Sequence, residues 1–266
     1  MNDEGRDLER DLSAQEREEL EERGAVAPDA EVGGDRTMRI DLHCHTSLSR
    51  DSGTPAVLIL DRCREEGIDV QAITDHHHVS AAQRLREMVE EQGGPEAVGV
   101  TIIVGEEIWT SEGELVALFI QERIEGNLSP EETVARIKEQ GGLVLLPHGF
   151  DPRKRSQLRP GARERIADEI DIVETFNTHV SSPRWNERAV EWARARGLPM
   201  SAGSDAHKLD EIGSAWVEVP ARPIRGPEDL LAALEDGVPT GEWTNPLLDV
   251  LPRLWDRAKR FVQRVF

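Results

Sequence analysis

The stretch MRIDLHCHT, residues 38–46, begins with apolar positions typical of a strand and ends in a polar cluster with two histidines. The apolar half predicts a β-strand over residues 38–42. Three further predicted strands, 69–73, 143–146 and 198–202, are also followed at once by histidine-containing clusters. Polar residues at the carboxyl ends of several strands are typical of a β/α barrel, in which those ends meet at one mouth.

The sequence from Met38 to about Pro220 alternates short apolar runs with helical patterns, which indicates repeated β-α units around a parallel sheet. The predicted strands cover residues 38–42, 69–73, 100–107, 115–120, 143–146, 170–175, 198–202 and 214–218. The predicted helices cover residues 55–66, 80–92, 130–140, 162–168 and 184–196. We expect one α/β barrel domain over residues 37–246. No glycine-rich phosphate loop of the Walker or dinucleotide type is present, which argues against a nucleotide-cofactor fold.

The two ends of the chain differ from this central pattern. Residues 1–36 carry 13 acidic and 5 basic side chains with few apolar anchors, which predicts a disordered acidic tail. In residues 247–266, apolar side chains recur at intervals of three and four while arginines line another face. This spacing predicts an amphipathic helix. Packing on its own domain is favoured for this helix over an oligomer contact or an anionic membrane surface.

The composition limits where the protein works and what it binds. The 266 residues include 32 basic and 52 acidic side chains, a formal charge of −20, which opposes loose binding of long nucleic acids. No apolar stretch approaches the roughly 20 residues of a transmembrane helix, and the N-terminus lacks a signal core. Only two cysteines occur, Cys44 and Cys63. We therefore expect a cytoplasmic protein without structural disulfides.

Seven of the eight histidines lie in the four clusters, together with carboxylates. On a strand, residues i and i+2 point to the same face. His43 and His45 can therefore bind one ion together, as can Asp205 and His207. Imidazoles with carboxylates favour Zn²⁺, Mn²⁺ or iron, with Mg²⁺ as a further option.

Two more carboxylates extend this set. Glu107, in GEE at another predicted strand end, can bridge two ions, and Asp51 lies near the first cluster. Each cluster alone would also be explained by a polar turn or a helix cap. Taken together, they favour a site for two or three divalent ions, because charge gathered at this density needs cations to neutralise it.

The ordered motifs DLHCHT, SRDS, ITDHH, GEE, PHGFD, ETFN and GSDAH, within residues 38–218, resemble the PHP (polymerase and histidinol phosphatase) superfamily, in particular its small stand-alone phosphoesterases. The resemblance implies a distorted seven-stranded (β/α) barrel with a two- or three-ion site at its C-terminal mouth. It also implies hydrolysis of phosphate esters.

The resemblance further assigns metal ligands by position. The implied first ion is bound by His43, His45, Glu107 and Asp205, the second by Glu107 and His148, and the third by Asp51, His76 and His207. Asp75, next to His76, would orient a metal-bound imidazole or relay a proton. The chain departs from its relatives where Glu114 replaces a ligand histidine, and where Glu174 or Asn177 stands in place of histidine or cysteine. These three residues are further candidate ligands.

Basic residues near the clusters are candidates for binding phosphate. Lys154 and Arg155 come just after His148, and a guanidinium fork matches a phosphate group well. A basic group beside a cation site indicates an anionic substrate. Further candidates for contact with the phosphate are Arg184 and Lys208. The candidate catalytic residues are Asp75, His207 and Arg155.

The sequence thus predicts a metal-dependent phosphoesterase acting on a small phosphate ester, either nucleotide-like or a sugar or amino-alcohol phosphate. A short-oligonucleotide exonuclease of the same family is one alternative. Amidohydrolase-type C–N hydrolysis is another, although none of the four lysines lies in a predicted strand, where such sites carry one. A non-catalytic, metal-stabilised interaction module is the third. The sequence is silent on the oligomeric state.

Overall fold

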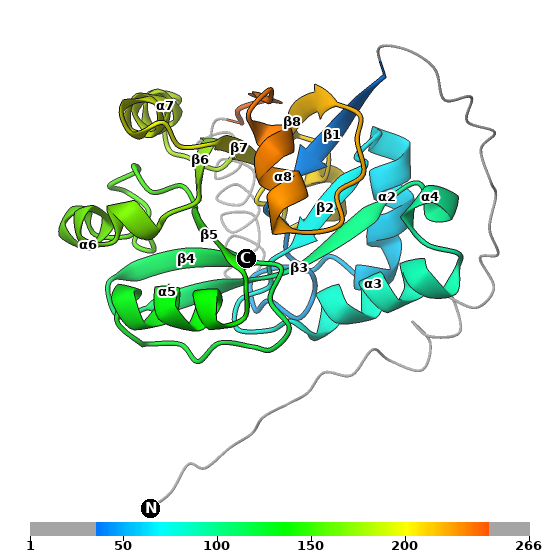
Figure 1. The fold of residues 1–266 in the computed structure, drawn as a ribbon, viewed down its shortest axis with the longest axis horizontal. Helices are drawn as coiled ribbons and strands as arrows, with labels where there is room; N and C mark the ends of the chain where they lie inside the picture. The colour runs from blue at the N-terminus through cyan, green and yellow to red at the C-terminus, as the bar shows by residue number, and fades with distance from the viewer. Residues whose placement is uncertain (1–35, 245–266) are drawn as a thin grey trace, which may run out of the picture.

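The computed structural model describes residues 36–244. The predicted C-terminal helix at 247–266 lies outside the described residues, as does the predicted acidic tail except for its last residue, Arg36. Within the described range, the chain forms a nine-stranded sheet with helices around its outside (Figure 1).

The strands are β1 (Thr37–Asp41), β2 (Val70–Ile73), β3 (Thr101–Thr110), β4 (Gly113–Leu118), β5 (Leu143–Leu146), β6 (Ile172–Asn177), β7 (Met200–Gly203), β8 (Ala215–Pro220) and β9 (Val238–Gly241). Their order in the sheet is β7-β6-β5-β4-β3-β2-β1-β8-β9. The pairs β1-β2, β2-β3, β5-β6 and β6-β7 are parallel, whereas β3-β4, β4-β5, β1-β8 and β8-β9 are antiparallel.

The expectation of a parallel sheet is therefore wrong for part of the molecule. Only Ser111 and Glu112 separate β3 from β4. Antiparallel strands can be joined by two residues, whereas a parallel pair needs a crossover of a dozen or more. The eight predicted strands are present, but β9 was not predicted.

Backbone hydrogen bonds join the edge strand β7, and the residues that follow it, to the residues that follow β1. Leu42 N donates to Ala202 O at 3.2 Å, Asp205 N to His43 O at 2.8 Å, and His45 N to Ala206 O at 3.0 Å. These bonds nearly close the sheet into the expected distorted barrel. They also place two of the histidine clusters side by side.

The helices are α2 (Ile59–Glu66), α3 (Ser80–Glu91), α4 (Pro95–Val98), α5 (Pro130–Glu139), α6 (Pro160–Arg165), α7 (Arg184–Arg196) and α8 (Pro227–Leu234), with 3-10 turns η1 (Ala56–Leu58), η2 (Ala167–Glu169) and η3 (Leu209–Glu211). The five predicted helices are present, and α4 and α8 are additional. At the start of α5, Ser129 Oγ accepts from Glu132 N at 3.2 Å, and the Glu132 carboxylate accepts from Ser129 N at 3.0 Å. This reciprocal capping satisfies two backbone donors of the first turn.

Apolar side chains fill two layers. The outer layer lies between the strands and the surrounding helices and includes the fully buried Ile59 of α2 and Ile137 of α5. The inner layer fills the barrel with residues such as Ile40 and Val70, and Leu230 of α8 packs into it. The polar clusters follow the carboxyl ends of the same strands, so a rigid apolar barrel positions the candidate site.

Candidate metal centre

The predicted metal-binding side chains gather at the carboxyl side of five strands. His43 and His45 follow β1, His76 follows β2, and His148 follows β5. Asp205 and His207 follow β7, whereas Glu107 lies within β3, which continues to Thr110 beyond the predicted strand end at 107. Two of these residues have left-handed backbone conformations, with φ of 27° at His148 and 53° at Asp205. Such conformations cost about 1–3 kcal/mol each outside glycine, and they concentrate at functional sites.

A first donor group is formed by His43, His45, Glu107 and Asp205, all of them buried. Glu107 Oε2 lies 3.2 Å from both His43 Nε2 and His45 Nε2. Asp205 Oδ1 lies 3.5 and 3.4 Å from the same two nitrogens. Two imidazoles and two carboxylates that face one another at these distances suit a single divalent cation.

A second donor group shares Glu107 with the first. Its other oxygen, Oε1, lies 3.0 Å from His148 Nε2. Glu114 Oε2 approaches the same nitrogen to 3.5 Å. The Glu107 carboxylate therefore lies between two donor groups, and Glu114 belongs to the second of them.

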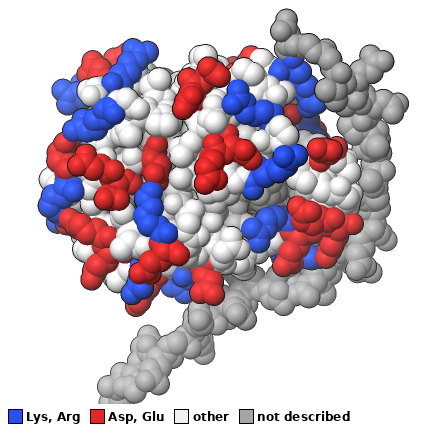
Figure 2. Space-filling model, viewed as in Figure 1, with Lys and Arg blue, Asp and Glu red and all other residues white. Residues whose placement is uncertain are grey.

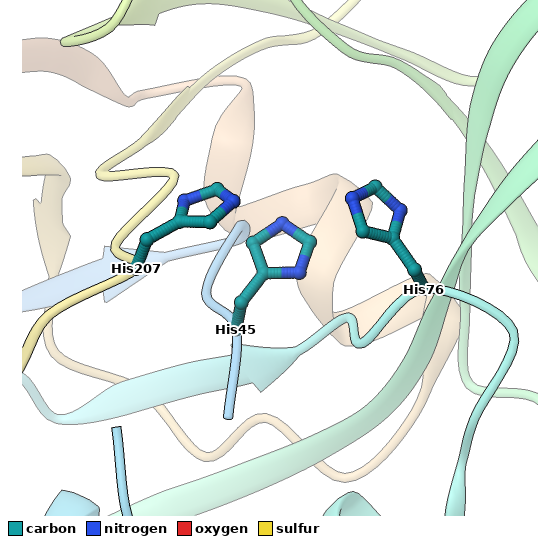
Figure 3. Close-up of side chains that lie close together, drawn as sticks. All are labelled: His45, His76 and His207. Atoms are coloured by element: carbon teal, nitrogen blue, oxygen red, sulfur yellow. The ribbon is translucent and has the colours of Figure 1, made fainter. Parts of the chain in front are cut away.

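A third donor group is partly open to solvent. Asp51 Oδ2 lies 3.5 Å from the Nε2 atoms of both His76 and His207, and its side chain is 55% exposed. The ring of His45 lies between those two imidazoles, with centroid separations of 4.7 Å to His76 and 4.4 Å to His207 (Figure 3). This group connects the buried first group with the surface.

Neighbouring side chains hold the rings of the first group in place. His43 Nδ1 is 3.0 Å from Glu174 Oε1, and His45 Nδ1 is 3.0 Å from Ser49 Oγ. Ser49 Oγ donates in turn to Asp75 Oδ1 at 2.7 Å. Because each Nδ1 has a partner, each Nε2 is directed into the centre, as is usual for metal-bound histidines. Asp75 thus contacts the ring of His45 through Ser49.

The electrostatics of the first group favour a cation. Burial alone would lower the pKa of His43, but the charges of Glu107, Asp205 and Glu174 outweigh it and raise that pKa well above its usual value. Burial would also raise the pKa of Glu107, yet the neighbouring His43 holds it well below its usual range. Carboxylates that stay ionised in a buried site need positive charge beside them.

The second group also fits a metal ion. Burial, followed by repulsion from Glu107, raises the pKa of Glu114 to about 8. A divalent cation between the two carboxylates would remove that repulsion. His148 Nδ1 is buried without a hydrogen-bond partner among the described residues.

The centre as a whole contains four overlapping sets of three residues. Within each set, one donor atom from each residue lies within 4.8 Å of the other two, and all of these atoms are nitrogen or oxygen. This donor set fits Mn²⁺, Zn²⁺ or iron.

Comparison with known proteins identifies the family. Family models match two stretches of the chain, the PHP domain over residues 41–141 and a PHP-associated region over residues 183–239. The chain is also 34% identical over 199 residues to the uncharacterized protein MJ0417 of Methanocaldococcus jannaschii, covering 73% of this chain and 75% of that protein. The chain belongs to the PHP domain family.

Solved structures share the PHP fold. A Bacteroides vulgatus two-domain protein that contains a predicted PHP-like metal-dependent phosphoesterase has a TM-score of 0.62 at 18% identity, covering 82% of this chain and 70% of that one. The lesion-specific endonuclease of Pyrococcus furiosus has a TM-score of 0.57 at 17% identity, covering 77% of this chain and 58% of that one. At these identities the likeness establishes the fold alone.

The four candidate phosphate-binding residues of this PHP protein lie in different environments. Lys154 lies at the centre, where its Nζ is 2.7 Å from Asp205 Oδ2. Arg155 is exposed. Arg184 is also exposed and stacks on Trp185, with its guanidinium carbon 4.2 Å from the ring centroid. Lys208 is exposed and pairs with Glu211 at 2.7 Å. Of the four, Lys154 is the one that the structure brings into contact with a candidate metal ligand.

Glu174 and Asn177, the remaining candidate ligands, contact residues of the donor groups but do not belong to a donor group. Glu174 accepts from His148 N at 2.6 Å in addition to contacting His43. Asn177 Nδ2 donates to Glu174 at 3.0 Å and to Asp205 at 3.2 Å. Because this amide presents its donor to both carboxylates, Asn177 steadies the centre and turns no ligand atom toward it.

Sequence reasoning missed three residues that shape the site. Ser49 connects Asp75 to His45, as described above. Asp41 accepts from the backbone N of His43 and of Ser204, both at 3.1 Å, and so ties two ligand-bearing turns together. Burial raises the pKa of Asp41 to about 6.

Trp109 is the third. Its Nε1 donates to His76 Nδ1 at 3.3 Å, and the residue is 48% exposed. The spacing from Glu107 to Trp109 on β3 places both on one face, and this signal could have revealed Trp109.

Among the helices between residues 36 and 244, none is long and apolar enough to span a bilayer.

Proposed function

We propose that this PHP protein is a metal-dependent phosphoesterase that hydrolyses a small phosphate ester, either nucleotide-like or a sugar or amino-alcohol phosphate. The observation that carries the proposal is Glu107, whose two carboxylate oxygens serve different donor groups. One lies 3.2 Å from His43 Nε2 and the other 3.0 Å from His148 Nε2. A carboxylate between adjacent cation positions is typical of hydrolytic sites that use two metal ions.

The three donor groups would hold two or three divalent ions, namely Mn²⁺, Zn²⁺ or iron, with Mg²⁺ as an option. When bound, such ions lower the pKa of water and stabilise charge on phosphoryl oxygens. The chain itself fixes the ligands before substrate arrives, since Glu174 and Ser49 orient the rings of His43 and His45. Asp75, hydrogen-bonded to Ser49, and the partly exposed His207 are placed to hold or pass protons beside the centre.

Lys154 is the basic group best placed to meet a phosphate oxygen. Its ammonium is bonded to Asp205, but an ammonium carries three donors, so this one bond does not saturate it. Arg155, Arg184 and Lys208 are additional candidates on the surface. The same geometry disfavours C–N hydrolysis of the amidohydrolase type, because a carboxylated Lys154 would place a negative charge beside Asp205.

One face of the described part of the chain does not suit a long nucleic acid. On the face shown in Figure 2, acidic and basic side chains of the described residues are interspersed. A protein that binds long nucleic acid needs a continuous basic track. In the third donor group, the side chain of Asp51 is 55% exposed, so solvent reaches the centre on this side.

The proposal can be tested by loading the purified protein with Mn²⁺ and assaying it against nucleoside monophosphates, sugar and amino-alcohol phosphates, short oligonucleotides and a panel of amides. We expect release of inorganic phosphate from a monoester, abolished by His43→Ala and by Asp205→Ala. Asp236→Ala is the matched control, since that carboxylate is exposed and pairs with Arg222 at 3.5 Å.

Three results would contradict the proposal. They are phosphate release that survives both ligand substitutions, cleavage of amides alone, and ion binding without any turnover. Release of nucleotides from oligonucleotides, with no action on monoesters, would replace the proposed function by the exonuclease alternative.

A further inference from the structure

Lys154 is an unusual side chain for a centre that attracts cations. It lies in the loop after β5, its side chain is only 21% exposed, and its Nζ is 2.7 Å from Asp205 Oδ2. This short contact with a carboxylate oxygen is an ion pair, so the side chain brings a positive charge into the donor groups.

The loop holds Lys154 in this position. Lys154 N donates to Asp151 O at 3.1 Å, and the carboxylate of Asp151 is anchored by Ser181 Oγ at 2.9 Å. On the other side of Lys154, Gln157 Nε2 donates to Gly149 O at 2.9 Å. Backbone and side-chain bonds on both sides of Lys154 thus fix the loop that carries it.

The two oxygens of Asp205 have different partners. Oδ1 faces the first donor group, 3.5 Å from His43 Nε2 and 3.4 Å from His45 Nε2. Oδ2 accepts from Lys154 Nζ at 2.7 Å and from Asn177 Nδ2 at 3.2 Å. With Lys154 in place, Asp205 can offer a metal ion Oδ1 but not Oδ2.

Asp205 belongs to a further candidate cation position. His43, His148 and Asp205 present donor atoms within 4.8 Å of one another. His148 Nε2 also lies 3.0 Å from Glu107 Oε1. Lys154 Nζ, 2.7 Å from Asp205 Oδ2, therefore lies beside this position.

We propose that the Lys154 ammonium takes the place of one divalent ion next to Asp205 Oδ2, so that the protein binds one ion fewer than its donor set would otherwise hold. Lys154 then acts as a built-in cation, and Asp205 binds the ion of the first donor group through Oδ1 alone. The inference concerns this metal centre and requires no particular substrate.

The test counts ions and does not depend on turnover. Wild type, Lys154→Met and Lys154→Gln are saturated with Mn²⁺, freed of excess ion by gel filtration, and analysed for manganese per chain by plasma mass spectrometry and by calorimetric titration. We expect both neutral variants to bind one equivalent more than wild type. Two neutral substitutions are used so that a failure of one to fold leaves the other to decide.

Two controls fix the interpretation. Arg153→Met removes an exposed basic side chain from the same loop and should leave the ion count unchanged. Lys154→Arg keeps a positive charge at this position and should also leave the ion count unchanged. An unchanged or lower ion count in the folded neutral variants would overturn the proposal, whether or not the protein hydrolyses phosphate esters.

Discussion

The inside of the barrel and the centre at its carboxyl mouth are equally buried but consist of opposite kinds of side chain. Ile40, Val70 and Leu230 in the interior are 0% exposed, as are His43 and His45 in the centre. Burying apolar surface is favourable by itself. Burying imidazoles and carboxylates is costly unless each finds a partner of opposite charge. The interior therefore stabilises the fold, whereas the buried charges of the centre would be neutralised by a bound cation.

The largest expected effect comes from the carboxylate shared by two donor groups. Glu107→Gln keeps the shape of the side chain but removes the charge between His43 and His148. We expect manganese binding and phosphate release to fall to background, with little change in unfolding temperature of the ion-free protein. Calorimetric titration and a phosphate assay on the same preparation measure both quantities.

The adjacent Glu106 supplies a matched control on the other face of β3. Its Oε2 accepts from Ile124 N at 2.8 Å, and no bond joins it to the donor groups among the described residues. Burial raises the pKa of Glu106 to about 8. Glu106→Gln should therefore leave ion binding unchanged. Equal losses in the two variants would show that the strand, rather than the bridging carboxylate, accounts for the effect.

A substitution in the apolar interior should lower the stability of the fold and leave ion binding unchanged. Leu230→Ala removes a fully buried side chain that joins α8 to the barrel. A cavity of this kind costs about 2–5 kcal/mol in the free energy of unfolding. Urea denaturation of the ion-free protein should show this loss, while the folded variant still binds manganese like wild type. Weakened ion binding at full stability would contradict the division between interior and centre.

The parts of the fold and site that could be predicted depend on local spacing. His43 and His45 were recognised as a pair because they are two residues apart after a strand. The antiparallel β3-β4 pair was not predicted, because the predicted strands 100–107 and 115–120 left seven residues between them where the structure leaves two. The contact between His43 and Glu174 joins residues 131 positions apart, which no spacing rule reveals. The edge strand β9 escaped prediction because its four residues, VPTG, lack the apolar run that marks the equally short β2 and β5. The helix α8 also escaped prediction.

A smaller effect is expected from the side chain that orients a ligand without belonging to a donor group. Glu174→Gln should weaken the hold on the His43 ring, since the carboxylate contacts its Nδ1 at 3.0 Å. Loss of such a partner usually costs about 10–100-fold in metal affinity. Manganese titration measures the change, with Glu218→Gln on β8 as the control. A loss as complete as that of Glu107→Gln would place Glu174 among the ligands themselves.

The smallest expected effect is a change in tryptophan fluorescence, and it comes from Trp109 beside the third donor group. Trp109 Nε1 donates to His76 Nδ1 at 3.3 Å, which requires a free electron pair on that nitrogen. An ion bound through Nδ1 would take this pair. An ion bound through Nε2 would leave the proton on Nδ1, which then becomes a donor. Either way, ion binding at His76 must break the indole bond.

Zinc titration followed by tryptophan emission tests this consequence, because Zn²⁺ has a filled d shell and does not quench fluorescence as paramagnetic ions do. We expect a change in emission that saturates with ion binding and disappears in Trp109→Phe, while zinc affinity stays close to that of wild type. Trp216→Phe, whose ring instead lies 4.3 Å from the Arg39 guanidinium carbon, should keep the change. An emission change that persists undiminished in Trp109→Phe would come from another tryptophan. It would show that ion binding does not disturb Trp109 in the wild type, and would remove His76 from the ligand set.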